Sequence, residues 1–338
     1  MRLIFNKSFF FFLLVLSFSS FAFAQNEREA GIKLYKGGDY KGAIKVLKQA
    51  AKGNSGDAAE VLYFLGLAYF QTGKSKEAQK AFAASIKLKP EDSRGYIGMA
   101  YVQYSNNKIS EAATSARKAV ELNNQSFEAH YLLGLISLEG GFYNVAYDRA
   151  DLVIKINPNY AEAYLLKAEA LTLSFAQTSG AVLKSQKERV GLLKEAALNM
   201  EKYLSLSTND KEKTNQRERF ESLKFFADYY EKPENQPQNT LEPNPLRGDN
   251  FNDIKIISKP RAQYTDAARN QGISGSIRLL IELSGDAKIK SILVLRGLGG
   301  GLTAQAIKAA KQIKFEPATK DGQPISVVKI IEYSFTIY

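Results

Sequence analysis

The fold of this chain is decided by residues 59–92, which read AEVLYFLGLAYFQTGKSKEAQKAFAASIKLKPED. Small residues of this stretch recur downstream at a fixed distance of 34 residues. One series is Gly66, Ala100, Gly134 and Ala168, and a second is Ala78, Ala112 and Ala146. Upstream, Gly31 and Ala43 keep the same internal spacing of 12 residues. Because a fixed period of about 20–50 residues is typical of stacked structural units, the sequence predicts a repeat architecture.

Each unit has the pattern of two short antiparallel helices. Leu65 and Tyr69 recur at helical spacing, and Gly73 ends this first helix. Phe82 lies on the apolar stripe of a second helix, which Pro90 closes. The small residues let the two backbones approach closely, while the larger side chains fill the groove between adjacent units. One pair cannot bury its apolar face alone, so the units must stack into a superhelix.

This pattern resembles the tetratricopeptide repeat (TPR). The matching residues are Leu65-Gly66, Tyr69, Gly73, Ala78, Phe82 and Pro90, together with the turn Gly38-Asp39-Tyr40. The resemblance implies an α-solenoid over residues 25–230, with repeats at about 25–58, 59–92, 93–126 and 127–160. A fifth repeat begins at Ala161 but departs from the pattern through an insertion near residues 174–186. An amphipathic helix over residues 211–230 is expected to cap the stack.

The resemblance also implies a ligand surface on the concave face, which the first helix of each pair lines. The residues projected onto that face are Tyr35, Tyr63, Phe70, Tyr101, Tyr104, Tyr131 and Leu138. Such a groove suits an apolar or aromatic-bearing peptide. The alternative is that many of these tyrosines pack between repeats, because a buried tyrosine keeps only its hydroxyl near water.

The first 24 residues have the pattern of a secretory signal. Arg2 and Lys7 precede an apolar run of 15 residues, Phe9 to Phe23, and Ala22-Phe23-Ala24 supplies a cleavage pattern. A bilayer span needs about 20 apolar residues, so cleavage after Ala24 is expected, with an uncleaved anchor as the alternative. No later stretch is long and apolar enough to span a membrane.

The period changes after a proline-rich boundary. Residues 231–250 contain Pro233, Pro237, Pro243 and Pro245 and are expected to act as a semi-rigid linker. Strands are predicted over residues 274–283, 288–296 and 327–338, because apolar residues alternate there. Helices are predicted over residues 265–271 and 302–313. Residues 251–338 are therefore expected to form a small domain with the order αββαβ.

This second domain resembles the C-terminal domain of TonB. The matching residues are Lys259-Pro260, Tyr264, Ala267-Ala268, Gly275-Ser276-Ile277, Gly285-Asp286, Phe315-Glu316-Pro317 and Gly322-Gln323-Pro324. The fold class implied for the whole chain is an α-solenoid followed by a small α+β domain. TonB-like domains pair an exposed sheet edge with a short extended segment of an outer-membrane transporter, so the resemblance implies β-strand addition.

The last strand is the expected binding edge, because no proline blunts it and its charges are only Lys329 and Glu332. The residues assigned to this edge are Val327, Val328, Lys329, Ile330, Ile331, Glu332, Tyr333, Ser334 and Phe335, with Arg261 beside them. The alternative is that a partner subunit or the repeats cover the strand.

Composition leaves little room for catalysis. The chain has no cysteine and one histidine, His130, which lies in the repeats and is expected to be a packing residue. One histidine cannot serve the usual triads or a repeated metal spacing, so we expect no enzyme, metal or cofactor. The glycine-rich residues 297–301 lack the lysine of a phosphate loop and are expected to be a flexible connector.

The leading interpretation is a periplasmic scaffold of a Gram-negative cell envelope. The repeats would hold one partner, and the C-terminal domain would pair with a segment of an outer-membrane or envelope protein. The alternatives are an inner-membrane-anchored component of TonB-dependent transport and a cell-wall or lipid-surface binder that uses the basic C-terminal domain. A homodimer through that domain is a further possibility. Membrane contact is expected to be peripheral or through an uncleaved N-terminus, and nucleic acid is not an expected partner of an exported protein.

Overall fold

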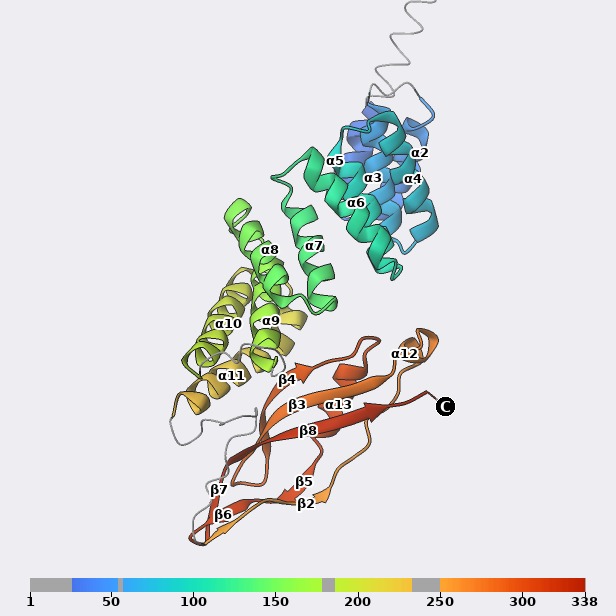
Figure 1. The fold of residues 1–338 in the computed structure, drawn as a ribbon. Coiled ribbons are helices and arrows are strands. Elements are labelled where there is room, and N and C mark those ends of the chain that lie inside the picture. The colour runs from blue at the N-terminus through green and yellow to red at the C-terminus, as the bar shows by residue number, and fades with distance from the viewer. Residues whose placement is uncertain (1–25, 54–56, 178–185, 233–249, 338) are drawn as a thin grey trace, which may run out of the picture. The chain divides into compact units, whose positions relative to one another are not determined.

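The computed structural model describes residues 26–53, 57–177, 186–232 and 250–337 (Figure 1). The predicted signal segment, residues 1–24, and most of the predicted linker lie outside these residues. The chain divides into two compact units, residues 1–136 and residues 137–338. Among the helices of the described ranges, none is long and apolar enough to cross a membrane.

The first unit is a row of paired helices, as the 34-residue period predicts. Its helices span residues 26–36, α2 (Tyr40–Ala50), α3 (Ala58–Gln71), α4 (Ser75–Leu88), α5 (Ser93–Ser105), α6 (Ile109–Leu122) and the greater part of α7 (Phe127–Glu139). Asp57 and Asp92 cap α3 and α5 by accepting hydrogen bonds from the backbone of Glu60 and Arg94. Gly73 and Asn107 adopt left-handed backbone conformations in the turns between α3 and α4 and between α5 and α6.

Small residues let one aromatic ring bridge neighbouring repeats. The ring of Phe82 in α4 is only 1% exposed. A Cβ atom added to Gly66 in α3 would lie 2.7 Å from this ring, and one added to Gly98 in α5 would lie 2.2 Å from it. The ring therefore needs glycine on the first helix of its own repeat and of the next.

The predicted packing histidine, His130, is 3% exposed, and its Nε2 lies 3.0 Å from the carbonyl oxygen of Asn124.

The second unit combines the last helices with the C-terminal domain. Its helices are α8 (Tyr143–Ile156), α9 (Ala161–Ala176), α10 (Gln186–Leu206) and α11 (Asp210–Glu231). The C-terminal domain contains α12 (Asp266–Asn270) and α13 (Leu302–Ala310). Its main strands are β3 (Gly275–Leu283), β4 (Ile289–Arg296) and β8 (Val327–Phe335), which form an antiparallel sheet in the order β4-β3-β8.

Five short strands complete the C-terminal domain and were not predicted. They are β1 (Phe251–Asn252), β2 (Lys255–Ser258), β5 (Lys314–Glu316), β6 (Ala318–Lys320) and β7 (Gln323–Ile325). They pair as β1-β6-β7 and β2-β5. Each has only two to four residues, which is too short for the alternation of apolar and polar residues to be recognised in the sequence.

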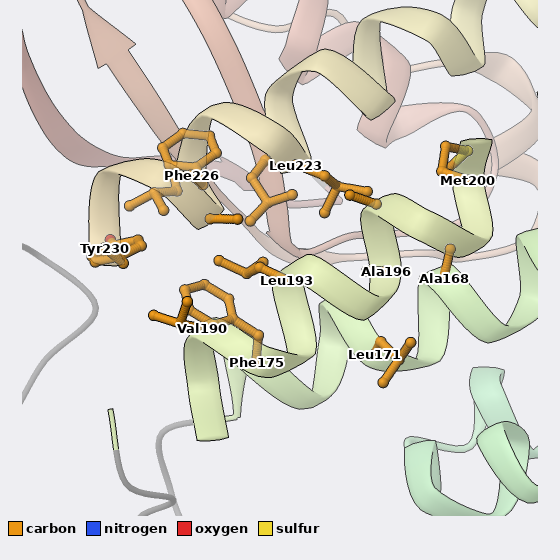
Figure 2. Close-up of a cluster of buried hydrophobic side chains, with 14 of the residues drawn as sticks. Ala168, Leu171, Phe175, Val190, Leu193, Ala196, Met200, Leu223, Phe226 and Tyr230 are labelled. Carbon is orange, nitrogen blue, oxygen red and sulfur yellow. The ribbon is translucent and has the colours of Figure 1, made fainter. Parts of the chain in front are cut away.

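The main sheet has an apolar core on each of its two faces. On one face, Ile277, Leu279 and Ile281 of β3 pack with Leu302 and Ala306 of α13. On the other face, the sheet residues Leu280, Leu293, Leu295 and Val328 belong to the same buried cluster as side chains of α9, α10 and α11. Figure 2 shows the helical part of this cluster, including Phe175, Leu193, Leu223, Phe226 and Tyr230.

The second face of β3 is buried as well. The alternating pattern places Arg278, Leu280 and Glu282 on this face, and there Leu280 is fully buried and Glu282 is 6% exposed. Ser291 donates a hydrogen bond of 2.8 Å to the Glu282 carboxylate, which satisfies one of its buried oxygens. The helices of the second unit therefore cover this face of the sheet.

Substitution of Gly98 tests the repeat packing. Gly98→Ala should lower the free energy of unfolding by about 1–3 kcal/mol, because the new methyl group overlaps the buried ring of Phe82. Gly191→Ala in α10 is the matched control, since its Cβ meets nothing within 4 Å. The control should be stabilising by about 0.5–1 kcal/mol. Urea unfolding followed by circular dichroism measures both, and a Gly98→Ala protein as stable as the wild type contradicts the packing.

Tyr333 of β8 gives a second test. Its side chain is 5% exposed, its Oη is buried without a hydrogen-bond partner among the described residues, and burial raises its pKa to about 12. Tyr333→Phe should therefore leave the stability unchanged or raise it by about 1 kcal/mol.

The pH dependence of the same variant has a definite sign. The phenol is neutral when protonated, and its folded pKa of about 12 lies above an unfolded value of about 10. Its contribution to stability is therefore present below pH of about 10 and is lost as the pH rises toward 12. Tyr333→Phe should lose less stability than the wild type across this window. Equal losses in alkaline unfolding experiments would show that Tyr333 ionises normally.

Candidate protein-interaction site

The sheet β4-β3-β8 has two edges where a further strand could add. The β4 edge is occupied within the second unit. The backbone N–H of Ile292 in β4 donates a hydrogen bond of 3.2 Å to Oγ of Ser222 in α11. The helix therefore takes a backbone donor that an added strand would need, which is one way in which proteins protect a sheet edge.

The same hydrogen bond fixes which backbone groups of β8 point outward. Since the N–H of Ile292 points away from β3, its register partner Ile281 directs its own backbone groups toward β8. Ile281 pairs with Lys329, and the register continues without interruption to the other end of β8. The odd-numbered residues of β8 therefore bond to β3, and the even-numbered residues direct their N–H and C=O groups to the outer edge.

A second contact supports this assignment independently. Nζ of Lys259 donates a hydrogen bond of 2.7 Å to the carbonyl oxygen of Glu332, an even-numbered residue. This carbonyl must face away from β3 for a side chain outside the sheet to reach it. The lysine amine also lies 5.0 Å from the centre of the Tyr333 ring. Lys259 thus forms a hydrogen bond with one backbone acceptor at the outer edge of β8.

The predicted edge residues fall into three groups. Val328, Ile331, Tyr333 and Phe335 are buried and serve the two cores. Val327, Lys329 and Ile330 are half-buried, and Lys329 forms an ion pair of 2.7 Å with Asp253. Glu332 and Ser334 are exposed. The accessible part of the edge therefore centres on Glu332 and Ser334, which is a shorter stretch than the nine residues expected.

Residues 253–261 contact β8 through two side chains. Asp253 contacts Lys329 and Lys259 contacts Glu332, while β2 between them pairs with β5. Arg261 is exposed and forms no ion pair within the described residues. The structure places Arg261 two residues after the lysine that reaches the edge, and it shows no direct contact between Arg261 and β8.

The aromatic residues predicted for the concave face of the repeats are all half-buried. Five of them pack against buried clusters of the repeats: Tyr35, Tyr63, Phe70, Tyr101 and Tyr104. Burial raises the pKa of Tyr63 to about 12, and the guanidinium of Arg94 lies 5.4 Å from its ring. These contacts show that packing between repeats uses most of the predicted aromatic surface.

A charged row at the start of the first helices was missed by sequence reasoning. Glu60 forms ion pairs with Arg28 at 3.7 Å and with Arg94 at 3.5 Å. Arg94 also forms an ion pair of 2.7 Å with Asp92. The side-chain hydrogen bonds between Arg94 and Asp92 raise the pKa of Arg94 above its usual value and lower the pKa of Asp92. The 34-residue step from Glu60 to Arg94 could have revealed the row. The role of Ser222, in contrast, leaves no signal in the sequence.

None of the described residues forms a group of three or more histidine, cysteine, aspartate or glutamate side chains that could hold a metal ion. The arrangements that are present, an open strand edge and half-buried aromatic rings, suit binding of polypeptide.

Comparison with curated proteins finds relatives that match part of this chain. The chain is 28% identical over 142 residues to BBSome complex member BBS4 of Bos taurus, which covers 42% of this chain and 27% of that protein. It is 27% identical over 103 residues to the Sol locus transcriptional repressor of Clostridium acetobutylicum, covering 30% of this chain and 32% of that protein. The chain thus spans about a third or less of the length of these relatives.

Solved structures similar to this chain are also helical-repeat proteins. A thermophilic TPR protein of Thermus thermophilus matches with 20% identity and a TM-score of 0.45, over 60% of this chain and 99% of that one. The protein pilF of Pseudomonas aeruginosa matches with 16% identity and a TM-score of 0.47, over 61% of this chain and 88% of that one.

Family models match both parts of the chain. The model described as tetratricopeptide repeat matches residues 28–93 and 97–146. The model described as Gram-negative bacterial TonB protein C-terminal matches residues 260–337. Both resemblances drawn from the sequence are therefore confirmed, as is the predicted fold class. This chain carries tetratricopeptide repeats followed by a C-terminal domain of the TonB family.

Proposed function

We propose that this chain is an exported adaptor of the cell envelope, whose C-terminal sheet accepts an extended segment of a partner protein at the outer edge of β8. The observation that carries the proposal is the pair of exposed residues Glu332 and Ser334, whose backbone groups point away from β3. An added strand obtains affinity from such main-chain groups and selectivity from the side chains that alternate along them. With the β4 edge occupied by α11, β8 is the edge of this sheet that remains for a partner.

The partner we favour is an outer-membrane or other envelope protein that presents an extended segment. The match to the TonB C-terminal family supports this class, and a TonB-dependent transporter is one member of it. The repeats would hold a second partner, because TPR repeats are protein-interaction modules.

The location we propose is the periplasm, after removal of residues 1–24. The apolar run and the Ala22-Phe23-Ala24 pattern support export. The second candidate is an anchored component of transport that keeps its N-terminal segment in the inner membrane.

N-terminal sequencing of the protein isolated from its natural host separates these two candidates. We expect a mature start at Gln25, because the signal pattern places cleavage after Ala24. A start at Met1 in the membrane fraction would contradict the periplasmic adaptor and favour the anchored component.

Proline at Ser334 tests the edge itself. Ser334→Pro removes an outward N–H and places a ring where an added strand would lie, while an edge strand tolerates proline at such a position. We expect capture of partner proteins from an envelope extract to fall about tenfold or more, since a backbone hydrogen bond and close approach are both lost. Ser334→Val is the matched control, because it keeps the N–H and suits a strand.

The fold of both variants is checked by circular dichroism before capture. Equal capture by Ser334→Pro and Ser334→Val would contradict edge binding. Proline at Tyr333 is not a suitable test, because the N–H of Tyr333 points toward β3 and its loss would damage the sheet. If the partner at the edge is a second copy of this chain, light scattering will show a dimer that Ser334→Pro abolishes and Ser334→Val retains.

A further inference from the structure

The cap helix α11 contacts the strand-accepting sheet in three different ways. Its side chains Leu223 and Phe226, 2% and 0% exposed, lie in the buried cluster that contains Val328 of β8. Its Ser222 accepts the hydrogen bond from the N–H of Ile292 at the β4 edge. Its Glu218 forms an ion pair of 2.6 Å with Lys311, the residue that ends α13. The helix α11 therefore contacts one face of the sheet, the β4 edge, and the end of α13, which covers the opposite face.

The buried cluster that contains these α11 side chains also includes residues of the first half of β8. Val328 is 3% exposed within the cluster, and Ile330 packs against the same cluster. These two residues share the side-chain face of Glu332 and Ser334, because side chains alternate along a strand. The first half of β8 thus packs in the buried cluster with α9, α10 and α11. The second half of β8 carries the exposed edge residues Glu332 and Ser334. The position and twist of the exposed edge depend on the half that is packed.

Uncovering the sheet would change what it offers to a partner. Without α11, the N–H of Ile292 would lose its acceptor and the β4 edge would become available to strands. Leu280, Leu293 and Leu295 would also lose part of their cover, because they are buried in the cluster to which α11 contributes. A docked α11 therefore restricts strand addition to one edge and keeps the other face of the sheet from aggregating.

We propose that α11 is a positioning element for the β8 edge, with Phe226 and Ser222 as its positioning residues, so that docking of α11 and binding of a partner strand are thermodynamically coupled. The proposal rests on strand addition at β8, the function proposed above. By linkage, a strand that prefers the docked sheet must stabilise α11 by the same factor by which α11 strengthens strand binding. The last helices that follow the repeats are in this way part of the binding site of the C-terminal domain.

The test uses a defined probe. Ten-residue peptides are selected from a random display library on the full-length protein and counter-selected against Ser334→Pro, so that the retained peptide requires the β8 edge. Failure to obtain any such peptide would count against strand addition itself. Once a peptide is in hand, every later result bears on the role of α11 alone.

Affinity for this peptide is then measured by calorimetry in two matched variants. Phe226→Leu loosens α11, and Phe82→Leu makes the same change at an equally buried ring in the first unit. We expect Phe226→Leu to weaken binding about fivefold or more, a typical coupling between two sites, and Phe82→Leu to leave it within about twofold. Unchanged affinity in a folded Phe226→Leu protein would overturn the proposal.

The unaltered protein gives a second readout that does not depend on a variant. Addition of the peptide should slow amide hydrogen exchange in α11, residues 210–231, although the peptide does not touch that helix. Ser222→Ala removes the acceptor of the Ile292 N–H and the hydrogen bond that the hydroxyl donates to the carbonyl oxygen of Glu218, and it should speed exchange at Ile292 and reduce the slowing in α11. Exchange in α11 that does not respond to the peptide would overturn the coupling, even if Phe226→Leu proved too unstable to study.

Discussion

A sheet with apolar side chains on both faces must be covered on both faces, and the C-terminal half of this molecule is organised by that constraint. One face of β4-β3-β8 is covered by α13, as expected for a small α+β domain. The other face carries Leu280, Leu293 and Leu295 and is covered by helices that follow the repeats. Each such leucine contributes about 1.5–3 kcal/mol when it is fully buried, so the cover is a large part of the stability of this unit. The helical cap and the sheet therefore form one core.

The same constraint determines which edge of the sheet is available. A helix that lies across the face and reaches the β4 edge can satisfy a backbone group there, and Ser222 does so. The β8 edge has no equivalent helix among the described residues. A lysine from the segment beside it bonds to one outward carbonyl, while Glu332 and Ser334 remain exposed. A flexible lysine side chain is a weaker obstacle to an added strand than a packed helix. The β8 edge is therefore more accessible to a partner strand than the β4 edge.

Much of the architecture could be predicted from the sequence, because helical repeats and long strands produce periodic patterns of residue types. The 34-residue step of Gly66, Ala100 and Gly134 predicts the helical repeats, and alternation from Ile277 to Leu283 predicts a central strand. Strands of two to four residues leave no period, so β1, β2, β5, β6 and β7 were missed. The direction in which each backbone N–H of β8 points depends on its pairing register, which no side-chain pattern records. The covered second face could have been inferred, because Leu280, Leu293 and Leu295 are apolar residues on that face. For the repeats, packing explains most of the aromatic residues that the pattern assigned to a ligand surface.

The central claim is that a partner strand adds to the outer edge of β8. Residue-resolved amide hydrogen exchange of the full chain, with and without its captured partner, tests it most directly. The account predicts that the amides of Glu332 and Ser334 exchange quickly in the free protein and become protected in the complex, whereas those of Ile331 and Tyr333 are protected in both states. Protection that spares Glu332 and Ser334, or that appears only in the helical repeats, would contradict the account.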